Sequence, residues 1–125
     1  MSKDWEKVVL STKHTVRDAL AVINAAALRI CLVVDEERHL LGVVTDGDIR
    51  RAILSNVELT QSVTVVMNRT PITVSAHLSH VQLLETMRAY SILSLPILNE
   101  SCQLIGLETW EQTTKEPSYD NPVLI

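Results

Sequence analysis

The strongest constraint on the fold is an internal repeat, because the second half of this 125-residue chain matches the first at an offset of 64 positions. The segment LLGVVTDGD ends at Asp48, and the segment LIGLETWEQ ends at Gln112. Without a gap, the match runs from about residue 8 to 48 against 72 to 112, with apolar positions in phase throughout. A repeat of this length predicts two copies of one supersecondary unit, each too small to bury its apolar face alone.

Each copy has the pattern of a strand, a helix, two strands and a second helix. Two residue pairs are spaced as capping boxes at the start of the first helix of each copy: Thr15 with Asp18, and Ser79 with Gln82. The apolar runs at residues 30–34 and 40–44 flank a polar stretch, which is typical of a hairpin buried on both faces. We therefore predict an α/β (α+β) fold of tandem β-α-β-β-α repeats packed about a pseudo-twofold axis. We place the first copy in residues 1–56, the second in 57–114, and a linker in 115–125.

Composition excludes several classes of function. The net charge of −4, with no long run of one sign, argues against a nucleic-acid surface, which needs a basic face. No N-terminal apolar segment has the length of a signal peptide or a membrane span. Cys31 and Cys102 fit no zinc or redox spacing, so we expect small buried hydrophobes, no metal site and a reducing cytoplasm. We also find no arrangement of side chains that predicts a catalytic site.

The sharpest chemical signal is the run from Gly42 to Asp48, where an apolar strand meets a predicted helix at Thr45. Unpaired N–H groups at such a corner attract phosphate, and the Thr45 hydroxyl can donate to a phosphate oxygen. The Asp48 carboxylate, one turn along the helix, can accept from the two hydroxyls of a ribose. Thr-x-x-Asp is also an ordinary helix-capping pattern, and this alternative stays open for Thr45 and Asp48.

The repeated β-α-β-β-α order, with Gly-x-x-Thr-x-x-Asp after the last strand, resembles the CBS domain family over nearly the whole chain. The resemblance implies a non-catalytic pair with two clefts that commonly hold adenine nucleotides such as AMP or ATP, or S-adenosylmethionine, as regulatory ligands rather than tightly bound cofactors. It implies that Thr45 faces phosphate and Asp48 faces ribose, while main-chain groups near Leu10, Ser11 and Ile30 hold the base. It also implies a homodimer formed through the CBS pair.

In the second copy the aspartate of the family pattern is replaced by Gln112. The Thr109-x-x-Gln112 sequence is a good helix cap but a poor partner for a ribose. We therefore expect the second cleft, with Ser75, Thr109 and Gln112, to be weak or empty.

The sequence from Thr45 to Ala52 is more specific than the general family pattern. It resembles CBS pairs fused to enzymes of sugar-phosphate metabolism. Two attachments are familiar: a nucleotidyltransferase domain after the pair, or a sugar-phosphate isomerase domain before it. Met1 lies close to the first repeat, and the polar residues 115–120 are followed by the apolar stretch 121–125, which resembles the lead into a nucleotidyltransferase domain. We therefore predict a regulatory module fused to a sugar-phosphate nucleotidyltransferase of sugar-nucleotide biosynthesis. The alternatives are the CBS pair of an isomerase, and a structural dimerisation module with vestigial clefts.

Overall fold

The computed structural model describes residues 4–25 and 28–110, and within them the two copies share one order of elements. The first copy contains a 3-10 helix η1 (Asp4–Val8), β1 (Val9–Ser11), α1 (Val16–Ala25), β2 (Ile30–Val34), β3 (Leu40–Thr45) and α2 (Asp46–Leu54). After a linker with a second 3-10 helix, η2 (Val63–Val65), the second copy contains β4 (Val74–Ser75), α3 (His80–Tyr90), β5 (Ser94–Leu98) and β6 (Leu104–Thr109). The predicted second helix of the second copy lies outside the described residues.

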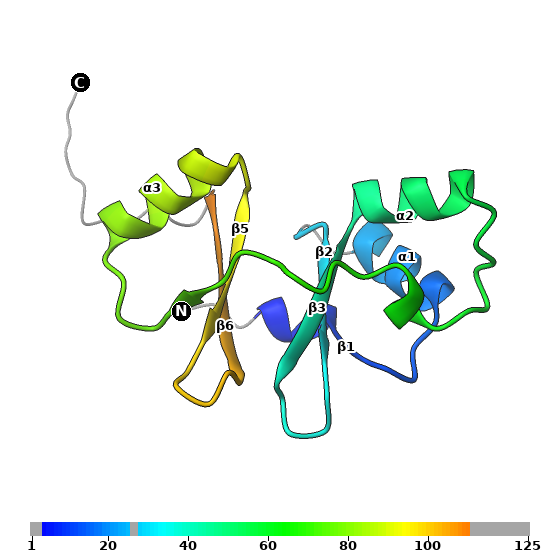
Figure 1. Cartoon of the computed structure of the whole chain (residues 1–125), viewed down its shortest axis with the longest axis horizontal. Helices are drawn as coiled ribbons and strands as arrows, with labels where there is room; N and C mark the ends of the chain where they lie inside the picture. Colours follow the sequence, from blue (N-terminus) through cyan, green and yellow to red (C-terminus); the bar gives the residue numbers. More distant parts are fainter. Residues whose placement is uncertain (1–3, 26–27, 111–125) are drawn as a thin grey trace.

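Each copy folds into a three-stranded sheet with the same topology, β1-β2-β3 and β4-β5-β6. The first strand runs parallel to the second, with a helix as the crossover, and the second pairs with the third as an antiparallel hairpin. The two sheets lie side by side with their helices on the outer sides, and the linker crosses between them (Figure 1). The structure therefore confirms the predicted α/β fold of two tandem repeats.

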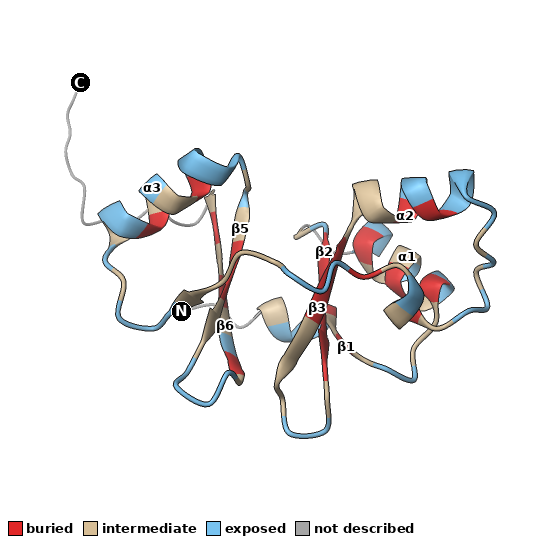
Figure 2. Cartoon of the chain, viewed as in Figure 1, coloured by how far each residue is buried: buried red, intermediate tan, exposed pale blue. Residues whose placement is uncertain are grey.

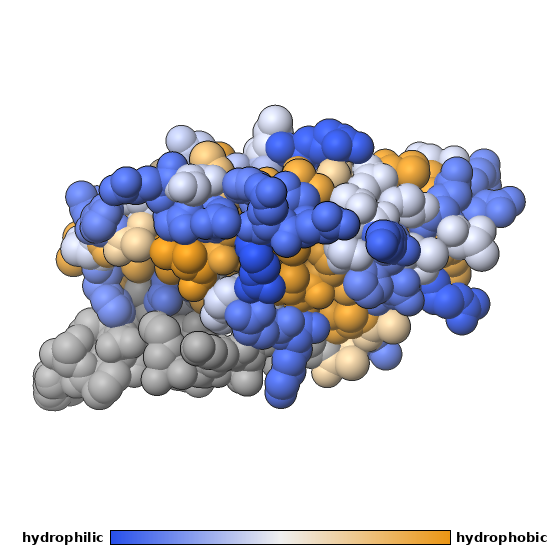
Figure 3. Space-filling view, turned by 90° about the horizontal axis from the view of Figure 1, so that it is seen from below, coloured by the Kyte–Doolittle hydropathy of each residue, from blue (hydrophilic) through white to orange (hydrophobic). Residues whose placement is uncertain are grey.

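The pseudo-twofold axis passes between the two hairpins. His39 forms an isolated antiparallel bridge with Gln103, the residue that the 64-position offset makes its own equivalent. The backbone N–H of Leu40 donates to the Cys102 carbonyl at 3.4 Å, and the N–H of Leu104 donates to the Arg38 carbonyl at 2.8 Å. The donor of one bond is equivalent to the donor of the other, and the same holds for the acceptors, as expected for a contact across a twofold axis. Seen from this hairpin side, polar side chains separate two apolar areas (Figure 3).

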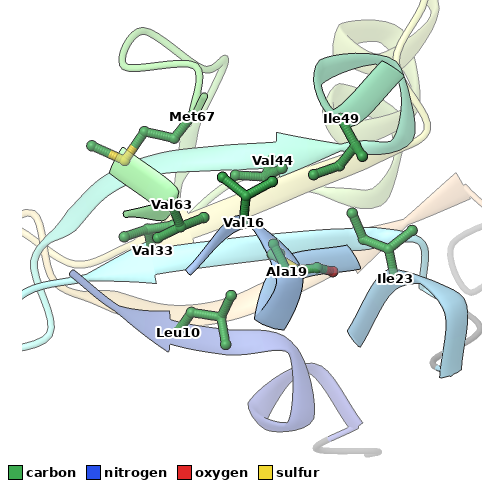
Figure 4. Close-up of a cluster of buried hydrophobic side chains, with 10 residues drawn as sticks. Leu10, Val16, Ala19, Ile23, Val33, Val44, Ile49, Val63 and Met67 are labelled. Carbon is green, nitrogen blue, oxygen red and sulfur yellow. The ribbon is translucent and has the colours of Figure 1, made fainter. Parts of the chain in front are cut away.

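Strand β2 is buried on both faces, as its continuous apolar sequence predicts. Cys31 and Val33 face α1 and α2 in one core cluster, which also contains Leu10, Val44 and Ile49 (Figure 4). Alternate residues of β2 face the second copy and join a cluster between the sheets: Ile30, Leu32 and Val34, with Val8, Val43, Leu104 and Leu107. Figure 2 shows this buried band running down β2 and β3. The two copies therefore share buried surface, which explains why the unit occurs as a pair.

The two capping boxes predicted from the sequence are present in the structure. The Thr15 N–H donates to Asp18 Oδ2 at 2.9 Å, and the Ser79 N–H donates to Gln82 Oε1 at 2.9 Å. The Thr15 backbone bond holds the pKa of Asp18 below its ordinary value. Burial raises the pKa of the Cys31 thiol to about 12, as expected for a buried cysteine that acts as a small hydrophobe. The same expectation is wrong for Cys102, which is exposed because it lies in the turn between β5 and β6.

The described residues contain neither a candidate membrane span nor a candidate metal site. No helix there combines the length and the apolar composition that crossing a bilayer requires. Over residues 4–25 and 28–110, no three His, Cys, Asp or Glu side chains gather as a potential set of metal ligands.

Candidate functional site

The corner between β3 and α2 is built as the sequence predicts, but its side chains bond to one another. Thr45 ends β3 in an extended conformation and caps α2, which begins at Asp46. Its backbone N–H donates to Asp48 Oδ2 at 2.9 Å, and its hydroxyl donates to the same oxygen at 3.0 Å. The other carboxylate oxygen, Oδ1, accepts from Arg51 at 2.6 Å. The capping interpretation is therefore realised, and Asp48 is only 14% exposed.

A cleft of about 400 Å³ opens beside this corner, between the two copies. Its walls are residues 28–30 and 91–94 at the starts of β2 and β5, Val43 and Thr45 of β3, Pro96 of β5, and the linker residues Asn68 and 70–72. We call this the central cleft. It lies at the end of the sheets opposite the hairpins, because Ile30 pairs with Thr45 and Ser94 pairs with Thr109.

Six of the lining positions form three equivalent pairs at the 64-residue offset: Leu28 with Ile92, Arg29 with Leu93, and Ile30 with Ser94. The central cleft therefore includes the pseudo-twofold axis. It extends to one side of the axis, toward Thr45 and beneath the linker, where Asn68 forms two backbone bonds with Val43 of 3.0 and 2.7 Å.

The structure brings only some of the predicted first-cleft residues together. Thr45 and Ile30 line the central cleft, and Asp48 lies next to Thr45. Leu10 and Ser11, whose role in holding the base stays a prediction, do not line the central cleft. The reason is strand direction: β1 is parallel to β2, so Ser11 pairs with Val34 at the hairpin end of the sheet. The Leu10 side chain is buried in the core beneath the helices.

The residues predicted to form the second cleft also lie in different places. Ser75 lines a separate hollow of about 440 Å³ beside the β5–β6 turn, together with His77 and Glu100. Thr109 is buried at the other end of this sheet, opposite Ser94. Gln112 lies outside the described residues. The prediction that the second cleft is weak or empty stays a prediction.

Sequence reasoning missed most of the central cleft. Asn68 and residues 70–72 of the linker line it, as does the stretch 91–94, and neither segment was proposed as part of a site. One signal was available for the second segment, because the offset that relates the copies maps the predicted site residue Ile30 onto Ser94. Arg29 had no signal of its own, since a single arginine after a helix is an ordinary surface residue.

Two β-α-β-β copies about a twofold axis, with a cleft between them, define a paired α/β module. The family model of the CBS domain matches residues 1–55 and 63–107, and the chain belongs to the CBS domain family. The CBS domain protein PAE2072 from Pyrobaculum aerophilum, solved in complex with AMP, shares the fold with a TM-score of 0.75. It is 23% identical, and the match covers 89% of this chain and 86% of that one. The CBS pair of MJ0100, solved with 5′-methylthioadenosine and S-adenosyl-L-methionine, has a TM-score of 0.74 at 20% identity, covering 86% and 88%.

Among curated proteins, the arabinose 5-phosphate isomerase GutQ of Salmonella typhi is 31% identical over 80% of this chain. The isomerase KdsD of Francisella tularensis is 28% identical over 92% of it. The chain spans only 30% and 35% of the length of these two relatives. Both are sugar-phosphate isomerases, so the similarity supports the isomerase alternative and gives no support to the predicted nucleotidyltransferase.

Proposed function

We propose that this CBS pair is a non-catalytic regulatory module that binds an adenine nucleotide in the central cleft. The single observation that carries the proposal is the cleft itself, whose volume of about 400 Å³ lies within the usual range for small-molecule sites. Its walls combine apolar side chains for a base with the Thr45 hydroxyl at a helix start. The related pairs PAE2072 and MJ0100, which were solved with AMP and with adenosyl compounds, support a ligand of this class.

In this proposal the bonds around Asp48 rearrange when the ligand enters. Arg51 is 72% exposed, and its pair with Asp48 is a surface pair three residues apart on one helix. Such pairs contribute only about 0.2–0.5 kcal/mol, so a ribose hydroxyl can replace Arg51 at little cost. A carboxylate has about four acceptor positions, so Asp48 can keep its bond from the Thr45 N–H while it accepts from the ribose. The Thr45 hydroxyl is then free to donate to phosphate.

We further propose that the module regulates a sugar-phosphate enzyme in the reducing cytoplasm. The isomerase class is favoured, because GutQ and KdsD are isomerases and this chain matches about a third of their length. Nucleotide binding would act by favouring one of two arrangements of the attached domain, and only a difference in affinity between those arrangements can do so. We also propose that the first copy ends at residue 56 and the second at residue 114, and that the module is fused to a catalytic domain.

A structural dimerisation module is the second candidate function. It is favoured by apolar side chains that stay exposed on the helices, among them Ile53 and Leu54 of α2 and Val81 of α3. A homodimer would cover such a surface, and it is compatible with nucleotide binding. If dimerisation is the sole function, however, isothermal titration calorimetry should detect no binding of AMP to the chain.

We expect Asp48→Asn to lower the affinity of the chain for AMP by about tenfold or more, because it removes an acceptor for the ribose hydroxyls. The same change also removes one partner of a helix cap, which costs about 1 kcal/mol of stability. Isothermal titration calorimetry with AMP measures the affinity, and urea unfolding measures the stability.

The matched control is Asp18→Asn, because Asp18 accepts the Thr15 N–H at the same 2.9 Å as Asp48 accepts that of Thr45. Asp18 caps α1 and bonds to Thr15, which does not line the cleft, whereas Asp48 bonds to Thr45, which does. We expect the two variants to lose similar stability, and only Asp48→Asn to lose affinity. Equal affinities in the two variants would contradict the role of Asp48, and no AMP binding by the wild-type chain at millimolar concentration would contradict the function.

A further inference from the structure

The two walls of the central cleft differ in chemistry although the repeat makes them equivalent in position. Arg29 precedes β2 in the first copy, and its equivalent before β5 in the second copy is Leu93. On the first-copy side, Thr45 and Arg29 lie among apolar residues: Leu28, Ile30 and Val43. The second-copy side is formed by Ile92, Leu93 and Pro96 together with two serines, Ser91 and Ser94. Leu93 is 70% exposed, so this side presents apolar surface to the opening. The two walls therefore differ in charge: the first-copy wall carries a cation, and the second-copy wall carries none among its described residues.

Arg29 is also the one charged side chain among the described residues that line the cleft. A positive group stands out here, because the chain carries a net charge of −4. An anion that enters the cleft therefore meets a cation and no carboxylate in its described lining, and this arrangement favours anionic ligands over neutral ones.

Arg29 has no acidic partner among the described residues, unlike three of the other arginines. Arg38 pairs with Glu6, Arg50 pairs with Asp46, and Arg51 pairs with Asp48, at 2.6 to 3.0 Å. The exposed Arg29 guanidinium makes no such contact within residues 4–25 and 28–110, so a ligand would not have to break an existing ion pair. Its backbone has a φ of 58°, a left-handed conformation that is uncommon for residues other than glycine and that clusters at ligand-binding positions.

We propose that Arg29 selects ligands that carry a phosphate and orients them in the central cleft. The phosphate lies toward Arg29 and Thr45 on the first-copy wall, and the base lies toward Ile92, Leu93 and Pro96 on the second-copy wall. This inference rests on the proposed nucleotide-binding function and adds the chemical class and the direction of the ligand. An arginine suits this role because its planar guanidinium can donate two hydrogen bonds to one phosphate.

The experiment compares AMP with adenosine, which differ only in the phosphate, by isothermal titration calorimetry. In the wild-type chain we expect AMP to bind more tightly than adenosine. Arg29→Gln is expected to lower the AMP affinity about tenfold, the usual effect of losing one charge-assisted hydrogen bond, and to leave the adenosine affinity unchanged. Arg29→Lys keeps the charge and is expected to retain part of the preference for AMP.

Arg17→Gln is the matched control, because it makes the same change of net charge at an exposed arginine of α1 that does not line the cleft. It should leave both affinities unchanged. If Arg29→Gln weakens AMP and adenosine equally, or weakens neither, the role of Arg29 is overturned while nucleotide binding stands. If the wild-type chain binds neither ligand at millimolar concentration, the inference and the proposed function both fail.

Discussion

Replacing Leu32 with alanine is expected to lower the free energy of unfolding by about 2–5 kcal/mol. Leu32 lies at the centre of β2, is fully buried, and belongs to the cluster between the two sheets, together with Leu104 and Leu107 of the second copy. The substitution removes apolar contacts that both copies share and leaves a cavity. Domains of this size have a total stability of about 5–15 kcal/mol, so the loss is a large fraction of the whole. Urea unfolding followed by circular dichroism measures it.

Leu54→Ala is the control for this prediction, because Leu54 ends α2 and is 82% exposed. We expect it to change the stability by less than about 0.5 kcal/mol. A loss below about 1 kcal/mol for Leu32→Ala would mean that the surface between the sheets does little to hold the pair together.

The second large effect is expected at Gly42, where the linker crosses the edge of β3. A Cβ atom at this position would lie 2.7 Å from the backbone carbonyl oxygen of Asn68 and 2.9 Å from the Met67 side chain. The Met67 side chain can move, but the Asn68 carbonyl is fixed by its backbone bonds with Val43. Gly42→Ala should therefore displace the linker and destabilise the chain by about 1–3 kcal/mol.

The repeat supplies the control for Gly42. Gly106 is the equivalent glycine of the second copy, and a Cβ there would meet only ordinary contacts with Ile97 at 3.6 and 3.7 Å. Thermal unfolding of the two variants should show a clear decrease in the midpoint for Gly42→Ala and little change for Gly106→Ala. Equal midpoints for the two variants would show that the close approach of the linker to Gly42 does not contribute to stability.

Most of the fold could be predicted, because its signals are local or repeated. The capping boxes Thr15–Asp18 and Ser79–Gln82 mark true helix starts, and the apolar run at residues 30–34 is a strand buried on both faces. The offset also implied the pseudo-twofold axis, which the bridge between His39 and Gln103 realises.

The site was harder to predict, because it is assembled from segments that meet only in the folded pair. Thr45 was found because a strand end and a helix start coincide there in the sequence. The distance of Ser11 from the central cleft could not be predicted, because no local pattern states which end of a sheet a short strand approaches, and β1 runs toward the hairpin. Asp48 was identified correctly as a neighbour of Thr45, yet the sequence could not reveal that Arg51 already occupies one of its oxygens.

The most direct test of the proposed nucleotide site is a titration of the ¹⁵N-labelled chain with AMP, followed by amide chemical shifts. We expect saturable shifts at the amides that line the central cleft, above all Ile30, Thr45, Thr70 and Ser94. We expect no comparable change at the separate hollow around Ser75 and Glu100. Shifts confined to that hollow, or none at millimolar AMP, would contradict the proposed site.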